Sequence, residues 1–169
     1  ARTAAEAGTT LGRFALVLPD SVVVANVDRN LNRFAIAPDG RYLAFVGRAR
    51  DGRTTSIYLR RADESTVTRV RGTEGAAGPA FSPDGKQMIF SLTYGLGYGS
   101  QTWIADADGQ NARLALEDPQ SIIAFARWSP LGDRLAYLRM ADNNIPFTVG
   151  ELWLADGDGN DSKLVGPAD

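Results

Sequence analysis

Three copies of one turn motif constrain what this chain can fold into. In each copy an apolar lead-in enters a turn that contains proline and glycine, and a strand with alternating apolar residues follows. The copies are AIAPDGRYLAFV from Ala35, AFSPDGKQMIFSL from Ala80 and RWSPLGDRLAYLR from Arg127. Proline fixes φ near the value of a turn's first corner, and glycine takes the positive φ that closes a hairpin. Each copy therefore predicts an antiparallel hairpin.

Two more strands follow each predicted hairpin, and the whole unit repeats. The turn prolines, Pro38, Pro83 and Pro130, are 45 and 47 residues apart. Third strands are expected at 56–61, 101–106 and 151–156, and fourth strands at 66–70, 112–116 and 162–166. Four short strands per repeat of roughly 40 to 50 residues are typical of a β-propeller blade. We predict an all-β, partial or open propeller of three four-stranded antiparallel blades, over about 33–71, 79–116 and 124–166.

The residues before the first repeat predict a flexible tail and a pair of strands. Residues 1–12 are small and polar and predict a flexible tail, so the propeller segment is expected to cover 13–169. RFALVL (13–18) and VVVANV (22–27), separated by a Pro-Asp turn, predict an N-terminal strand pair. Such a pair would supply half of a fourth blade.

The third copy of the turn differs from the other two. Asp39 and Asp84 can each accept a hydrogen bond from their own turn, whereas Leu131 stands at the matching position. Gly132 is kept. We expect the third turn to lose the side-chain hydrogen bond and to be the weakest of the three.

The residue inventory argues against catalysis. The chain contains no Cys and no His, so thiol nucleophiles, imidazole bases and Cys-His zinc sites are excluded. No Gly-x-Ser-x-Gly elbow is present. A pair of carboxylates suffices for glycosidases, but the candidates lie in predicted turns or at strand ends. They are Asp118, Asp133, Asp142 and Glu151. We expect no enzyme activity and no catalytic residue.

A metal or cofactor is not expected either. Asp106, Asp108 and Glu117 have the first, third and twelfth positions of a calcium loop, but Asn111 stands where such loops need glycine. The DADGQN and DGDGND segments are therefore interpreted as hairpin turns. GLGYG (95–99) is followed by neither a lysine nor a helix, as a phosphate-binding loop would be, and is interpreted as a plain loop.

Charge and hydropathy limit the partners. The net charge is −2, and the arginines of the first half show no interleaved stacking platform, so nucleic acid is not expected. The chain contains no apolar run of the roughly 20 residues that span a bilayer. We expect no direct membrane span, and we expect any association with a membrane to come through partners or through an N-terminal anchor.

The repeats carry a family resemblance. Phe-Ser-Pro-Asp-Gly-Lys followed by Ile-Phe, and the segment from Trp103 to Leu114, resemble the repeats of TolB-type β-propellers. The resemblance covers about 34–165 and implies a bacterial, extracytoplasmic (periplasmic) protein beside a membrane complex. Residues 13–85 also resemble, more weakly, the propellers of bacterial receptor serine/threonine kinases, although the kinase motifs are absent.

The number of repeats shapes the functional hypothesis. TolB-type propellers usually close with six or more blades, and three clear copies are present here. Closure removes exposed sheet edges. We therefore expect more chain, self-association, or protein partners that cover the open side, the last including subunits of a membrane complex.

Loop composition suggests where a partner would bind. The tight turns share one rim of the propeller, and the variable loops share the other, where binding residues tend to lie. Apolar side chains stand in two of these loops, at Tyr94, Leu96, Tyr98, Met140, Ile145 and Phe147. They either form a partner-binding surface or fold back over the blades. The favoured hypothesis is a non-catalytic protein-binding scaffold; the alternatives are a ligand-sensing ectodomain of a receptor kinase and an accessory propeller of a peptidase.

Overall fold

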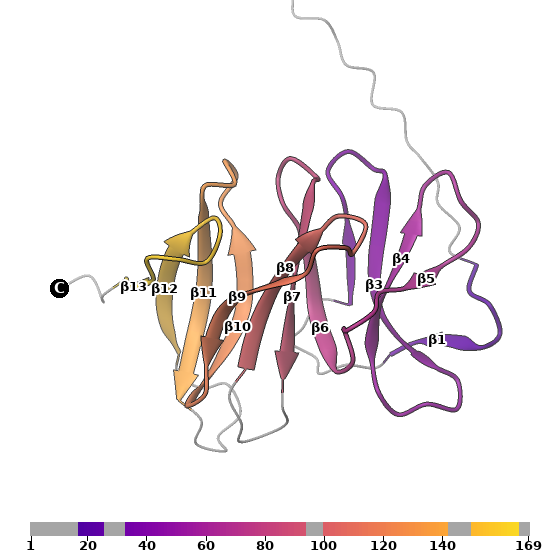
Figure 1. Ribbon diagram of the computed structural model, residues 1–169, viewed down its shortest axis with the longest axis horizontal. Helices are drawn as coiled ribbons and strands as arrows, with labels where there is room; N and C mark the ends of the chain where they lie inside the picture. Colours follow the sequence, from indigo (N-terminus) through magenta and orange to yellow (C-terminus); the bar gives the residue numbers. More distant parts are fainter. Residues whose placement is uncertain (1–16, 26–32, 94–99, 142–149, 166–169) are drawn as a thin grey trace, which may run out of the picture.

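Three antiparallel β-sheets stand side by side in chain order (Figure 1). The computed structural model describes residues 17–25, 33–93, 100–141 and 150–165. The regular structure in these residues is all β, as predicted, and each sheet forms one propeller-like blade. Among the described residues, no helix is long and apolar enough to cross a bilayer. The predicted tail, residues 1–12, lies outside the described part.

Each blade contributes a meander of neighbouring strands. Blade 1 contains β1 (Val22–Val24), β2 (Phe34–Ile36), β3 (Tyr42–Ala49), β4 (Ser56–Arg61) and β5 (Thr68–Arg69). Blade 2 contains β6 (Ala76–Phe81), β7 (Gln87–Thr93), β8 (Ser100–Asp106) and β9 (Arg113–Asp118). Blade 3 contains β10 (Ser121–Trp128), β11 (Arg134–Ala141), β12 (Glu151–Asp156) and β13 (Lys163–Leu164). The strand order in blades 2 and 3 follows the sequence, whereas in blade 1 both β1 and β2 lie beside β3.

The first strand of blade 1 is made of two pieces, and this corrects one prediction. Both β1 and β2 pair with the same edge of β3. The Ala25 N–H donates to the Val46 carbonyl at 2.9 Å, and the Val46 N–H donates to the Arg33 carbonyl at 2.9 Å. β1 thus pairs with β3; of the predicted strand 13–18, residues 17 and 18 are not in a strand, and residues 13–16 lie outside the described part of the chain. β1 completes blade 1 and does not begin a fourth blade.

The other two blades break their first strand at the matching place. The register of β6 shifts between Ala77 and Ala80, and that of β10 shifts between Ala124 and Arg127. The residue before each break is a buried alanine, namely Ala25, Ala77 or Ala124. A shift of this kind is a β-bulge, which bends and twists the strand. Blade 1 carries residues 26–32 at this point, where the other blades carry a bulge.

The Pro-containing turns use their side chains as predicted in two of the three cases. In blade 1 the Arg41 N–H donates to Asp39 Oδ1 at 2.9 Å, and in blade 2 the Lys86 N–H donates to Asp84 Oδ1 at 3.1 Å. Blade 3 lacks this bond, as predicted, because Leu131 has no acceptor in its side chain. There the Ser129 hydroxyl donates to Asp133 Oδ1 at 2.7 Å, as the Ser82 hydroxyl donates to Asp84 Oδ1 at 2.6 Å in blade 2.

The turns of neighbouring blades lie next to each other on one rim. A Cβ on Gly85 would lie 3.1 Å from the Asp39 carboxyl group, and one on Gly132 would lie 3.7 Å from Pro83. The Pro-containing turns of the three blades therefore form one continuous row on this rim, as the sequence analysis predicts.

Candidate partner-binding surface

Two apolar clusters fill the spaces between the blades, and they define two faces of each sheet. The trailing face of a blade packs against the blade that follows in sequence. In blade 1 this face contains two cross-strand pairs, Ala44 with Leu59 and Val46 with Ile57, beside Val70. All five side chains are at most 6% exposed, because blade 2 covers them.

The leading face of a blade packs against the blade before it. In blade 2 it presents Phe90 opposite Trp103 and Met88 opposite Ala105. In blade 3 it presents Tyr137 opposite Trp153 and Leu135 opposite Ala155. A leading face therefore combines a pair of aromatic residues with one small residue, and Ala105 and Ala155 are 1% and 3% exposed.

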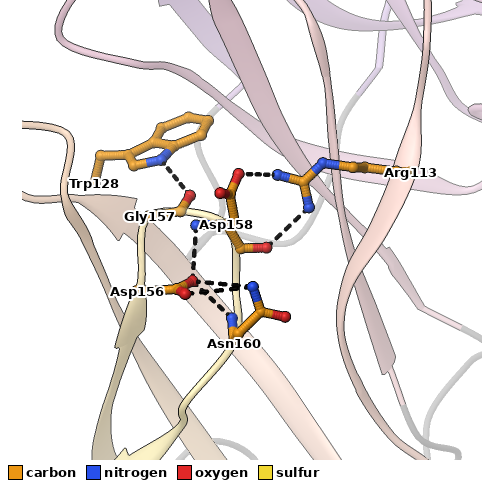
Figure 2. Close-up of polar contacts among 6 residues, drawn as sticks. All are labelled: Arg113, Trp128, Asp156, Gly157, Asp158 and Asn160. Atoms are coloured by element: carbon orange, nitrogen blue, oxygen red, sulfur yellow. Dashed lines mark hydrogen bonds and ion pairs between the residues drawn. The ribbon is translucent and has the colours of Figure 1, made fainter.

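Polar contacts link the last strand of blade 2 to the second turn of blade 3 (Figure 2). Arg113 donates to the Asp158 main-chain carbonyl at 2.9 Å and also pairs with the Asp158 carboxylate. The Trp128 indole N–H donates to the Gly157 carbonyl at 3.0 Å. Asp156 holds the turn itself, since its Oδ1 accepts the N–H groups of Asp158 at 3.0 Å and Asn160 at 2.8 Å. These hydrogen bonds lower the pKa of Asp156, the bond from Asn160 N–H most of all.

The second turn of a blade needs glycine where it meets the preceding blade. Gly109 of blade 2 has φ +84, and a Cβ there would lie 2.9 Å from the Val70 side chain. Gly159 of blade 3 has φ +96, and a Cβ there would lie 2.5 Å from the Ala115 carbonyl oxygen. Both the backbone conformation and the close approach exclude a side chain at this position.

The trailing face of blade 3 has no neighbouring blade among the described residues. Its residues occupy the same ladder positions as those of blade 1: Ala136 pairs with Leu154 and Leu138 pairs with Leu152. The Val165 N–H donates to the Leu152 carbonyl at 2.8 Å, just as the Val70 N–H donates to Ile57. Leu152 is 44% and Val165 37% exposed, however. Within the described residues no blade covers this face, and it is the candidate partner-binding surface.

Of the partner-binding residues expected from the loops, the structure describes Met140. Tyr94, Leu96, Tyr98, Ile145 and Phe147 lie outside the described residues. Met140 belongs to β11 and not to a loop; it pairs with Ile122 and is 6% exposed. Met140 therefore packs inside blade 3 and offers little surface to a partner.

The sequence reasoning missed the trailing face of blade 3. A signal was present, because Leu138, Leu152 and Leu154 repeat the apolar positions of Val46, Ile57 and Leu59. Repeats alone do not reveal which copy of such a face is covered, and only the arrangement of the blades does so.

The acidic residues weighed as ligands or catalysts have local structural partners. Asp106 accepts from the Asn111 side chain at 2.7 Å, Asp108 from the Gln110 N–H at 2.9 Å, and Glu117 from Gln101 at 2.6 Å. The described residues contain no group of three acidic side chains that could hold a metal ion.

Asp118 and Arg139 form the most shielded ion pair among the described residues. Their N and O atoms are 2.6 Å apart, with the Asp118 side chain 13% exposed. Burial opposes ionisation of Asp118, but hydrogen bonds from the Gln120 N–H, Ser121 and Arg139 outweigh it and lower its pKa. Arg139 lies over the Trp153 ring, 5.0 Å from its centroid. The pair links blade 2 to blade 3, and the Asp118 carboxylate is occupied by these hydrogen bonds.

Comparison with known sequences identifies relatives over part of the chain. An alignment 118 residues long, which covers 60% of this chain, shows 32% identity to the Tol-Pal system protein TolB of Bordetella pertussis. A shorter segment of 38 residues is 55% identical to the TolB of Albidiferax ferrireducens. The chain spans 24% and 9% of the length of these two relatives. No family model matches the chain.

Solved structures agree in fold. A putative TolB from Agrobacterium tumefaciens matches 81% of this chain and is matched over 50% of its own length, with a TM-score of 0.64 and 24% identity. The β-propeller domain of the trilobed protease from Pyrococcus furiosus matches with a TM-score of 0.59 and 20% identity over 82% of this chain and 43% of that one. A prolyl endopeptidase structure also matches, with a TM-score of 0.64 and 16% identity over 88% of this chain and 22% of that one. At this identity the peptidase matches show a shared fold. The blade architecture and the TolB relatives show that this chain contains a β-propeller region similar to that of TolB.

Proposed function

We propose that this chain is a non-catalytic protein-binding scaffold and that the trailing face of blade 3 is part of its binding surface. One observation carries the proposal: Leu152, Leu154 and Val165 occupy positions whose equivalents in blade 1 are buried by the next blade. Fully burying a leucine or valine side chain contributes about 1.5 to 3 kcal/mol. A protein that covers this face gains that stabilisation.

The setting is proposed from the relatives. The TolB relatives are named as members of a Tol-Pal system, and we extend to this chain an extracytoplasmic, periplasmic location within a larger assembly. Attachment to the membrane then comes from partners or from an N-terminal anchor.

The variable loops are proposed as a second part of the surface. Tyr94, Leu96, Tyr98, Ile145 and Phe147 lie in the β7–β8 and β11–β12 connections. Aromatic side chains are enriched among residues that dominate protein interfaces.

Site-specific photo-crosslinking in the native host tests the scaffold proposal. A photoreactive residue replaces Leu152, Leu96 or, as a control on the opposite rim, Leu131, which is 87% exposed. We expect the first two to give adducts with the same protein and the third to give none. A lack of protein adducts at both 152 and 96 would refute the scaffold role. Once the partner is known, replacing Tyr94, Tyr98 and Phe147 together by Ser is expected to weaken binding at least tenfold, and unchanged binding by a folded variant would remove the loops from the surface.

A second candidate is an accessory propeller of a peptidase. The fold match to the trilobed protease propeller and to a prolyl endopeptidase favours it. The same crosslinks decide between the candidates, because an adduct with a hydrolase domain supports the accessory role and an adduct with an envelope subunit supports the scaffold.

A further inference from the structure

We propose that the cleft between blades 2 and 3 binds a neutral carbohydrate, which lies against the aromatic wall formed by Tyr137 and Trp153 and accepts hydrogen bonds from Arg139. The cleft has a volume of about 350 Å³ and is lined by residues of both blades. Small-molecule sites have volumes of about 300 to 1,000 Å³, so the cleft has room for a small sugar. The site is separate from the trailing face of blade 3, because Trp153 belongs to the leading face of that blade.

Two aromatic rings form one wall of the cleft. Tyr137 and Trp153 both line it, and their rings stack with centroids 6.5 Å apart and an interplanar angle of 26°. The Trp153 indole N–H donates to Glu151 Oε2 at 3.1 Å, which holds the orientation of the ring. The face of an aromatic ring is negative, so it attracts the weakly positive C–H groups of a sugar ring.

The rest of the lining offers both donors and acceptors. Arg139 uses its Nε for the contacts with Asp118 Oδ2 at 2.6 Å and with the Ser121 hydroxyl at 3.3 Å. The guanidinium carries further N–H donors on its two NH₂ groups. Glu117 and Ser162 also line the cleft and are exposed, which adds a carboxylate acceptor and a hydroxyl. Sugar hydroxyls both donate and accept, so they match this mixed set.

The charges of the lining favour a ligand without charge. An anion would face the carboxylates of Glu117 and Asp118. A cation would face Arg139, whose guanidinium already lies over the Trp153 ring, 5.0 Å from its centroid, where a cation would bind. A neutral ligand avoids both repulsions and the cost of removing an ionic group from water. A neutral molecule that combines C–H faces with many hydroxyls is a carbohydrate.

The joint beside the cleft is polar where the preceding joint is apolar. On the trailing face of blade 2, Ser91 lies opposite Thr102, whereas blade 1 has Val46 opposite Ile57. Thr102 is 0% exposed, and its Oγ1 has no hydrogen-bond partner among the described residues. Leu116, the ladder partner of Thr102, lines the cleft. Packing alone does not explain this pair, because burying an unpaired polar group costs free energy.

A second cleft lies between blades 1 and 2 and lacks the aromatic wall. It has a volume of about 450 Å³ and contains Val70 and Gly109, where the first cleft contains Leu116 and Gly159. None of the described residues that line it is Phe, Tyr or Trp. A space between neighbouring blades is therefore common to both joints, whereas the aromatic wall is particular to the joint of blades 2 and 3. This difference assigns the carbohydrate to the smaller cleft.

Titration followed by nuclear magnetic resonance tests the proposal on the whole chain. The three tryptophans give three separate indole N–H signals. The probes are glucose, galactose, N-acetylglucosamine and cellobiose, with galacturonate and glucosamine as the charged analogues. We expect at least one neutral sugar to shift the Trp153 signal in a saturable way and to leave the Trp103 signal in place. Trp103 is the matched control, because it pairs with Phe90 as Trp153 pairs with Tyr137 but does not line either cleft.

Variants then identify the groups that hold the sugar. Trp153→Leu removes the ring, and Arg139→Lys keeps the charge but removes the fork of donors; each is expected to weaken binding at least tenfold. Trp103→Leu and Glu117→Gln are expected to change it less than threefold, with folding of every variant checked by circular dichroism.

Three results would overturn the carbohydrate site. The first is a Trp153 signal that none of the four neutral sugars moves. The second is tighter binding of galacturonate or glucosamine than of the neutral sugars, which would mean that charge and not hydroxyl groups is recognised. The third is unchanged binding by a folded Arg139→Lys or Trp153→Leu variant. The crosslinking test of the scaffold proposal is independent of all three.

Discussion

The hydroxyl of Thr73 links Ile57 in β4 to Val70, the residue after β5. The Ile57 N–H donates to Thr73 Oγ1 at 3.0 Å, and Thr73 in turn donates to the Val70 carbonyl at 2.7 Å. Thr73 is 1% exposed, so water cannot replace either bond. The residue after the last strand of blade 1 is thereby tied to the strand next to it.

Replacing Thr73 by Val keeps the shape and removes both bonds. Because a buried N–H and a buried carbonyl lose their partner, Thr73→Val is expected to lower the free energy of unfolding by about 1 to 3 kcal/mol. Thr73→Ser keeps the hydroxyl and is the control, expected to lose less. Urea unfolding measures both, and equal losses in the two variants would contradict the hydrogen-bond explanation.

Gly159 is predicted to be the more sensitive of two glycines with positive φ. Gly40 has φ +72, and a Cβ added there would meet no atom within 4 Å, whereas a Cβ on Gly159 would lie 2.5 Å from the Ala115 carbonyl oxygen. Gly40→Ala is expected to cost about 1 to 2 kcal/mol from backbone strain alone. Gly159→Ala adds the clash and is expected to cost about 3 kcal/mol or more. Similar unfolding midpoints for the two variants would show that the turn can move away from blade 2.

The contact between Arg113 and Asp158 is predicted to contribute little to the free energy of unfolding. Both side chains are substantially exposed, at 41% and 67%. Exposed pairs contribute about 0.2 to 1 kcal/mol. A double-mutant cycle with R113A and D158A is expected to give a coupling energy in this range that shrinks in high salt. A coupling well above it would mean that water is excluded from the pair.

Acid sensitivity is predicted at Asp84. The Ser82 hydroxyl, at 2.6 Å, and then the Lys86 N–H lower the pKa of this carboxyl below its ordinary value in the folded state. The stability that this group contributes is therefore present above its unfolded pKa of about 3.9 and is lost as pH falls through the lower folded pKa. Asp84→Asn should flatten the pH dependence of urea unfolding below the ordinary pKa of an aspartate, about 3.9. An unchanged slope would show that other carboxylates dominate acid unfolding.

Sequence reasoning located the strands because local rules decide them. Alternation in Tyr42–Val46 and the glycine of each Pro-containing turn are readable without any long-range contact. The same local rules did not reveal that Asp133, directly after Gly132, accepts a hydrogen bond from the Ser129 hydroxyl in the turn of blade 3.

The errors came from pairings between distant segments. Val22–Val24 reads as one half of a hairpin with its sequence neighbours, but it pairs with β3 across residues 26–32. Met140 reads as a loop residue because Ala141 and Asp142 follow it, yet the ladder with β10 continues to Ala141. The exposed face of blade 3 could not be predicted from one repeat. It is recognised only because the structure shows that blade 2 buries the equivalent residues of blade 1.

The divided first strand of blade 1 has a practical consequence for engineering. Val46 accepts from Ala25 and donates to Arg33, so the sheet continues although residues 26–32 separate its two partners in the sequence. The register breaks at Ala77/Ala80 and Ala124/Arg127 mark the corresponding places in blades 2 and 3. The break in blade 1 is therefore the site at which a foreign peptide, such as an epitope or a protease recognition sequence, can be grafted with the least loss of sheet hydrogen bonding, whereas the breaks in blades 2 and 3 lie at buried residues such as Pro79 and Ala126.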